Sequence, residues 1–323
     1  MLLRPGLCRL QVVVQSVQIH QQRTVGLGEG CILEAQMKME ITPDLEQLSH
    51  SEPNVQAKVL GVLLGADYRS CFLPRFLERA GVETSADWAA TGSQAVFFTR
   101  PVYAYLREQA ATVEDAESAQ AEINRFLGLP PTFELRRNID GKLTHPRGWN
   151  STFVLHMLDD NPDAVGQVGK DRVEAKLRLM EEVANTEVDL ILQTGTTTIF
   201  CELKWLSGFG PPSRKPALNA YGVDQMHRQY LAGLYLTQAA GCDVLYLVLT
   251  SELAGKTRHV AKHTGRLAEL VPAAAESATI HQATWQDVYE VAEECLPPGH
   301  ELLAYMRGKR AHRGKRSVPL LGR

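Results

Sequence analysis

Three charged side chains interrupt two apolar segments near the middle of this 323-residue chain. Asp189 lies in the run Val-Asp-Leu-Ile-Leu, and Glu202 and Lys204 lie in Ile-Phe-Cys-Glu-Leu-Lys-Trp. Because side chains alternate between the two faces of a strand, Glu202 and Lys204 would project from the same face. Charges inside such apolar strands are costly unless they are paired or functional. Carboxylates that hold a divalent cation beside a lysine would make a centre for phosphodiester hydrolysis.

The position of Asp189 depends on the turn between the two segments. A two-residue turn at Thr194 and Gly195 would pair Asp189 with Phe200 and set it diagonal to Glu202, roughly 7–8 Å away. Both carboxylates would then share one face and could hold one cation between them. A three-residue turn would move Asp189 to the opposite face. Thr-Gly is a weaker hairpin signal than Asn-Gly, so the register is a prediction for the structure to test.

An aspartate followed by a turn and by Glu-x-Lys on the next strand resembles the PD-(D/E)xK nucleases, also called restriction-endonuclease-like nucleases. The resemblance covers residues 169–294, and Val188 stands where the family motif has proline. It implies an α/β fold with a mixed central sheet flanked by helices. It also implies that Asp189 and Glu202 bind Mg²⁺, for which Mn²⁺ could substitute.

The resemblance implies further roles near these carboxylates. The backbone carbonyl of Leu203 would be another metal ligand, and Lys204 would position or activate the attacking water. In similar nucleases a glutamate on the preceding helix joins the metal site, and Glu174 would take this role on a helix predicted over residues 171–184. An exposed ion pair with Arg178, four residues on, is a slightly better explanation of Glu174. Glu181 is a rival candidate on the same helix.

The segments after the hairpin follow the order of elements in the core of the resembled fold. Hydrophobic periodicity predicts a helix over residues 219–239, strands over 243–250 and 279–281, and a helix over 285–294. Gln225 on the first of these helices resembles a Gln-x-x-x-Tyr motif of some exonuclease members, although Tyr230 follows it by five residues. Arg214 and Lys215 lie in the loop before that helix and would bind the phosphate backbone, unless they are ordinary solvated loop residues.

The charge and cysteine content limit the class of protein. With 34 basic and 37 acidic side chains the net charge is −3, so any DNA binding would depend on local basic patches. No apolar run of about 18 residues predicts a membrane span. The six cysteines include no Cys-x-x-Cys pair, and Cys201 and Cys242 are expected to be buried thiols. These features favour an intracellular, cytoplasmic protein, whereas DNA as its partner is what the nuclease resemblance implies.

The chain divides into four predicted regions. Residues 1–38 have no acidic side chain before Glu29 and would be a leader or a mis-called start; a mitochondrial location follows only if they form a transit peptide. Residues 39–150 would form a mainly helical accessory domain, used for DNA contact, packing or homodimer formation. Residues 151–296 would form the nuclease domain. Residues 297–323 would be a basic tail, disordered over residues 306–323.

Two functions follow from these observations. The first is a Mg²⁺-dependent DNA nuclease in which Asp189 and Glu202 bind the metal and Lys204 assists the attacking water. The second is a catalytically weak or inactive nucleic-acid-binding or assembly protein on the same fold. Both carboxylates and the lysine are present, which favours the enzyme, because an inactive binder would be free to lose any of them.

Overall fold

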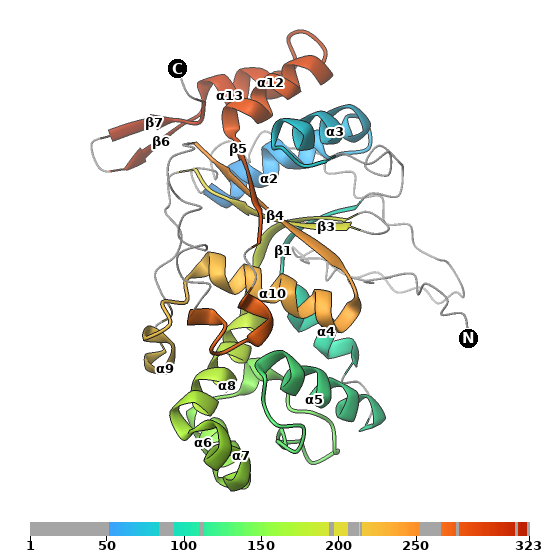
Figure 1. Cartoon of the computed structure of the whole chain (residues 1–323). Helices are drawn as coiled ribbons and strands as arrows, with labels where there is room; N and C mark the ends of the chain where they lie inside the picture. Colours follow the sequence, from blue (N-terminus) through green and yellow to red (C-terminus); the bar gives the residue numbers. More distant parts are fainter. Residues whose placement is uncertain are drawn as a thin grey trace, which may run out of the picture.

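The computed structural model describes residues 52–83, 94–109, 113–193, 197–205, 213, 215–251, 266–275, 278–313 and 316–321. A five-stranded mixed sheet lies at its centre, with helices on both faces (Figure 1). The expected α/β class with a mixed, helix-flanked sheet is therefore confirmed. The predicted leader, residues 1–38, lies outside the described residues.

The strands are arranged in chain order across the sheet. They are β1 (Gln94–Thr99), β2 (Val188–Gln193), β3 (Thr197–Leu203), β4 (Asp243–Thr250) and β5 (Ile280–Thr284). The pairs β1–β2 and β2–β3 are antiparallel, whereas β3–β4 and β4–β5 are parallel. The strand predicted over residues 243–250 is β4, and the short one predicted over 279–281 is β5, which extends to Thr284.

One layer of helices covers the face of the sheet that lies below it in Figure 1, and we call it the lower layer. Its buried side chains pack with Ile191, Phe200 and Tyr246 of the sheet. The layer consists of α4 (Pro101–Gln109), α5 (Val113–Leu127), η2 (Pro146–Gly148), α6 (Ser151–Asp160), α7 (Pro162–Val168), α8 (Lys170–Asn185), α9 (Pro216–Asn219), α10 (Gln225–Ala240) and η3 (Pro272–Ala275).

The upper layer covers the opposite face, where Leu190, Cys201 and Leu247 point (Figure 1). It consists of α2 (Glu52–Leu63), α3 (Arg69–Arg79), α12 (Trp285–Cys295) and α13 (Glu301–Gly308). Cys201 and Cys242 are free buried thiols, as expected.

Residues 39–150 do not form a separate accessory domain in the part of the chain that the structure describes. Strand β1 from this region is the edge strand of the central sheet, paired with β2. Helices α2 and α3 belong to the upper layer, and α4 and α5 to the lower layer. The prediction was wrong because it treated the Val-Phe-Phe run of β1 as part of a helical region, although aromatic and β-branched residues favour strands.

Helix α10 begins later than the predicted 219–239 helix. Asp224 caps this helix, since its carboxylate accepts a hydrogen bond from the backbone amide of His227 at 3.0 Å. In return, the His227 ring accepts a hydrogen bond from the backbone amide of Asp224. Such a capping box fixes the first turn. The predicted 171–184 and 285–294 helices match α8 and α12 to within a residue at each end.

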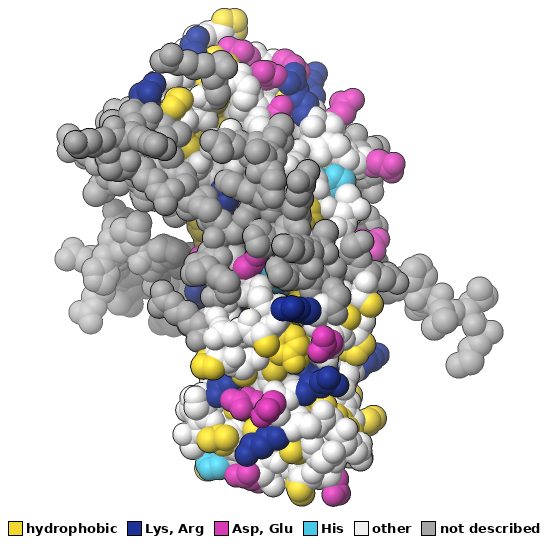
Figure 2. All heavy atoms as spheres, turned by 60° about the vertical axis from the view of Figure 1, so that its left-hand side comes forward, with side chains coloured by type: hydrophobic (Ala, Val, Ile, Leu, Met, Phe, Trp, Pro, Cys, Tyr) yellow, Lys and Arg dark blue, Asp and Glu magenta, His cyan; other side chains and the backbone are white. Residues whose placement is uncertain are grey.

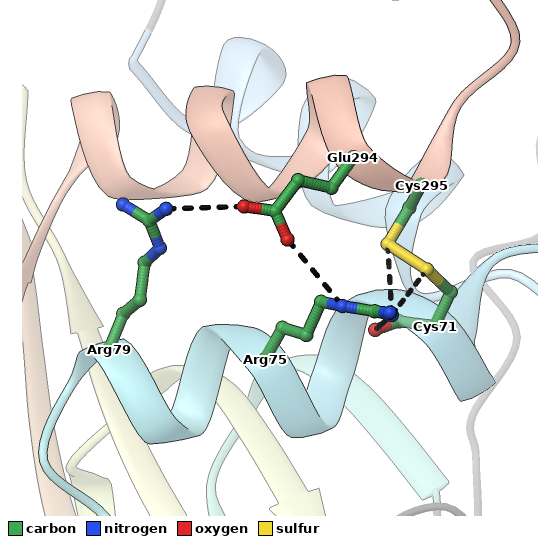
Figure 3. Close-up of a disulfide and its surroundings, with 5 residues drawn as sticks. All are labelled: Cys71, Arg75, Arg79, Glu294 and Cys295. Carbon is green, nitrogen blue, oxygen red and sulfur yellow. Dashed lines mark hydrogen bonds and ion pairs between the residues drawn. A yellow bond between two sulfur atoms is a disulfide. The ribbon is translucent and has the colours of Figure 1, made fainter.

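A disulfide joins the two outer helices of the upper layer. Cys71 on α3 is bonded to Cys295 on α12, 224 residues away (Figure 3). Beside it, Glu294 forms ion pairs with Arg75 at 3.5 Å and Arg79 at 3.2 Å. The sequence analysis did not predict this bond, because no local cysteine spacing indicates a partner so far along the chain.

The C-terminal segment is also ordered where it is described. Residues 297–323, expected to be a basic tail that is disordered from residue 306 on, contain α13 and a two-stranded hairpin of β6 (Arg310–Arg313) and β7 (Arg316–Pro319). None of the helices in the described part of the chain is long and apolar enough to cross a membrane.

Candidate metal centre

The hairpin places Asp189, Glu202 and Lys204 at one end of β2 and β3. Leu190 pairs with Cys201 and Gln193 with Thr198, so continuing the register sets Asp189 opposite Glu202. The predicted two-residue turn is therefore wrong: Gln193 pairs with Thr198 and not with Thr196. The register differs by two residues, which preserves the face, so Asp189 is directly opposite Glu202 and not diagonal to it.

Asp189 and Glu202 lie on the face of the sheet that the lower layer covers. Ile191 lies two residues after Asp189 and Phe200 two residues before Glu202, so each shares a face with that carboxylate. Both apolar side chains pack against α8 and α10. Directly opposed residues in an antiparallel pair have Cβ atoms roughly 4.5–5.5 Å apart. The predicted convergence of the two carboxylates is thus consistent with the backbone pairing.

Glu202 is fully buried and is held by two polar side chains. Its carboxylate forms an ion pair with Lys204 and accepts a hydrogen bond from the amide of Gln229 on α10. Burial raises the pKa of Glu202 to about 7, and the Asp189 charge adds to this rise, while Lys204 and Gln229 partly oppose it. Near neutral pH this carboxyl therefore exchanges a proton readily, a property common at functional sites.

Asp189 is more accessible than Glu202, being only partly buried. Its carboxylate accepts a hydrogen bond from the backbone amide of Leu203 at 2.8 Å. The Leu203 carbonyl, expected to be a metal ligand, accepts from the buried side-chain amide of Gln56 on α2 at 2.8 Å. A carbonyl oxygen has a second lone pair, so this contact leaves its role as a ligand an untested prediction.

The end of β3 is fixed by side chains from the upper layer and from β4. Besides Gln56, Trp285 at the start of α12 donates from its indole to the Lys204 carbonyl at 3.0 Å. Ser251, directly after β4, donates to the Trp205 carbonyl at 2.8 Å. Three successive carbonyls therefore each receive a side-chain donor from a different element. This support fixes the backbone that carries Glu202 and Lys204.

The acidic residues of α8 form a separate cluster. Arg178, which is buried, lies 3.8 Å from Glu174 and 3.2 Å from Glu181. Lys215, expected to bind DNA, forms an ion pair with Glu181. The predicted alternative for Glu174, an ion pair with Arg178, is therefore present, although Arg178 is buried and the pair was expected to be exposed. Arg214 lies outside the described residues.

Gln229 of α10 contacts Glu202, and the role expected for Gln225 stays a prediction. Gln229 is buried and donates to Glu202, whereas Gln225 is one helical turn earlier and only partly buried. The sequence analysis assigned no role to Gln229, because this contact depends on tertiary packing and has no local signal.

The two carboxylates suit a hard cation. Among the described residues, no group of three or more His, Cys, Asp or Glu side chains could hold a metal. The candidate centre would therefore offer a cation two carboxylates, those of Asp189 and Glu202. Mg²⁺ is usually held by only one or two carboxylates and keeps waters or substrate phosphates in its other positions. The donor type and number therefore fit Mg²⁺.

Comparisons with known proteins give no relative for this chain. No protein-family model, no curated protein and no solved structure matches it.

Proposed function

We propose that this protein is a Mg²⁺-dependent DNA nuclease with a restriction-endonuclease-like core. The single observation that carries the proposal is the pairing of Asp189 with Glu202 across β2 and β3, with Lys204 on the same face. The order of α8, the β2–β3 hairpin, α10 and β4 also agrees with the arrangement that the sequence resemblance implies.

Each residue has a distinct part in the proposed reaction. Asp189 and Glu202 would hold the cation, and Gln229 would stabilise the ionised form of Glu202 by donating to it. When bound, Mg²⁺ would neutralise charge on the scissile phosphate and make the attacking water more acidic. Lys204 would orient this water and stabilise the negative charge that develops on the phosphate oxygens.

A second function is favoured by the burial of Glu202. Its side chain has no exposed surface, and both Lys204 and Gln229 contact its carboxylate. Such a closed arrangement also suits a structural ion pair in a nucleic-acid-binding or assembly protein without catalysis. The partial exposure of Asp189 favours the enzyme, because an incoming cation would reach this residue more easily than the buried Glu202.

The two functions are separated by incubating the purified protein with linear, nicked, branched and single-stranded DNA in Mg²⁺, Mn²⁺ or EDTA. The nuclease proposal expects cleavage of at least one substrate in Mg²⁺ or Mn²⁺ and none in EDTA. DNA binding without cleavage in either metal would reject the nuclease and favour the second function. Cleavage that survives Glu202→Ala would reject the assignment of the centre.

A further inference from the structure

The positive charge of this chain is concentrated at its C-terminal end. Residues 307–323 contain seven basic side chains and no acidic one. The whole chain has 34 basic and 37 acidic side chains, so the remaining residues have 27 basic and all 37 acidic ones, a net charge of −10 against +7. A polyanion would therefore be repelled by most of the molecule and attracted to this segment.

This basic segment forms a β-ribbon. Strands β6 and β7 pair antiparallel, with Arg310 opposite Pro319 and Arg313 opposite Arg316. In Figure 1 the ribbon projects from the body of the molecule, next to α13. A two-stranded ribbon is one of the two elements that the major groove of a DNA duplex admits.

The base of the ribbon is attached to the strand that carries the candidate metal centre. The indole of Trp205 donates to the Pro319 carbonyl at 3.3 Å. The amide of Leu320 donates to the Lys309 carbonyl at 2.9 Å, which closes the base of the ribbon. Leu320 and Trp205 are buried in the same apolar cluster. Trp205 directly follows Lys204 in the chain but packs with the upper layer, so the ribbon is held at the same end of β3 as the proposed catalytic lysine, from the other face of the sheet.

We propose that the β6–β7 ribbon binds the phosphate backbone of duplex DNA and positions it at the metal centre; this inference rests on the proposed nuclease function. Basic side chains that neutralise phosphates release condensed counterions, so this binding depends strongly on salt. The attachment at Trp205 explains how phosphate contacts at the ribbon would fix the register of DNA relative to Glu202 and Lys204.

The test compares two full-length variants that lose the same charge. The ribbon variant is Arg310→Gln, Arg313→Gln and Arg316→Gln, on β6 and β7. The control variant is Arg125→Gln, Lys170→Gln and Arg172→Gln, all exposed and located on α5 and at the start of α8. These helices lie toward the bottom of Figure 1, away from the ribbon. In the lower part of Figure 2 the basic and acidic side chains are interspersed, so this end offers no single-sign surface in that view.

Binding of a labelled 30-base-pair duplex is measured in EDTA over a range of salt concentrations. Wild-type and control protein should bind alike, with equal slopes of log affinity against log salt. The ribbon variant should bind at least about tenfold more weakly at low salt, and its slope should fall by roughly two to three, about 0.9 for each lost phosphate contact. Circular dichroism and thermal midpoints should show that both variants are folded.

The outcomes separate the ribbon from the nuclease. If the ribbon variant binds and cleaves duplex DNA like the wild type, the ribbon proposal is overturned while the nuclease stands. If DNA binding depends on the ribbon but no DNA is cleaved in Mg²⁺ or Mn²⁺, the ribbon is supported and the nuclease fails. Ribbon-dependent binding to phosphatidylserine vesicles without binding to duplex DNA would also overturn the ribbon proposal.

Discussion

The side-chain amide of Gln56 donates to the backbone carbonyl of Leu203 at 2.8 Å, across 147 positions of the sequence. Gln56 is buried on α2, and Leu203 stands between Glu202 and Lys204. A helix from the N-terminal part of the described chain thus helps to position the strand end that carries the candidate centre.

Replacing Gln56 with leucine should therefore affect both stability and catalysis. The Leu203 carbonyl would be left buried without this donor, which costs on the order of 1–3 kcal/mol. We expect kcat for DNA cleavage to fall at least about tenfold while KM changes little, because the lost contact positions the reacting groups. Val59→Ala, a buried apolar truncation on the same helix, is the control. Equal kcat for Gln56→Leu, Val59→Ala and wild type would show that Gln56 has only a structural role.

The raised pKa of Glu202 predicts how metal binding depends on pH. With a pKa near 7, Glu202 is mostly protonated below neutrality and must lose its proton to bind a cation. The Kd for Mg²⁺, measured by calorimetry, should fall about tenfold for each pH unit up to about 7 and then level off. A Kd that stays constant between pH 5.5 and 8.5 would contradict this role.

The same pKa gives the sign of a stability effect. The folded-state pKa of Glu202 lies above its value of 4.5 in the unfolded chain, so the folded protein binds more protons between these two values. The contribution of Glu202 to the free energy of unfolding is therefore greatest below pH 4.5 and decreases as pH rises through about 7.

Gln229→Leu should shift the pH dependence of metal binding. The amide of Gln229 lowers the pKa of Glu202, so its removal raises this pKa further. We expect weaker Mg²⁺ binding than wild type at pH 7 and recovery toward the wild-type Kd at pH 9. Gln225→Leu, one turn earlier on α10, is the matched control and should bind Mg²⁺ like wild type. If both variants lose Mg²⁺ binding equally at pH 7 and pH 9, the proposed effect on Glu202 is wrong.

The Cys71–Cys295 disulfide should contribute substantially to stability. It closes a long loop and joins α3 to α12, whose first residue, Trp285, supports the Lys204 carbonyl. The neighbouring ion pairs of Arg75 and Arg79 are about half exposed and would contribute little. Loss of the bond should lower the free energy of unfolding by on the order of 4 kcal/mol.

Denaturant unfolding with and without a reductant measures this contribution. The reductant should destabilise the wild type and leave the double variant Cys71→Ser/Cys295→Ser unchanged. Equal wild-type stability in both conditions, with free thiols confirmed by mass spectrometry after reduction, would contradict the prediction.

The sequence predicted the elements with strong periodicity and failed where long-range pairing decides the structure. The runs of α8, β4 and α12 are long and locally consistent, so their bounds followed from the hydrophobic pattern. The face of Asp189 followed from the period of two, whereas its partner depended on a turn that Thr194 and Gly195 specify weakly. The role of Gln229 and the support from Gln56 depend on tertiary packing, which has no local signal.

The domain division failed for a related reason. Strand β1 is short and separated from β2 by most of the lower layer, so its place in the sheet cannot be read from neighbouring residues. The C-terminal hairpin was mistaken for a disordered tail because its basic composition resembles that of disordered segments. Its base is nevertheless held by Leu320 and Trp205 in the apolar core.

The most direct test of the central claim is the cleavage rate of three full-length carboxylate variants in Mg²⁺. Asp189→Asn and Glu202→Gln should each reduce kcat at least about a hundredfold, since each removes a proposed charged ligand. Glu187→Gln, an exposed carboxylate next to β2 that pairs with Arg100, should retain wild-type activity. Wild-type cleavage rates in Asp189→Asn and Glu202→Gln would contradict the account.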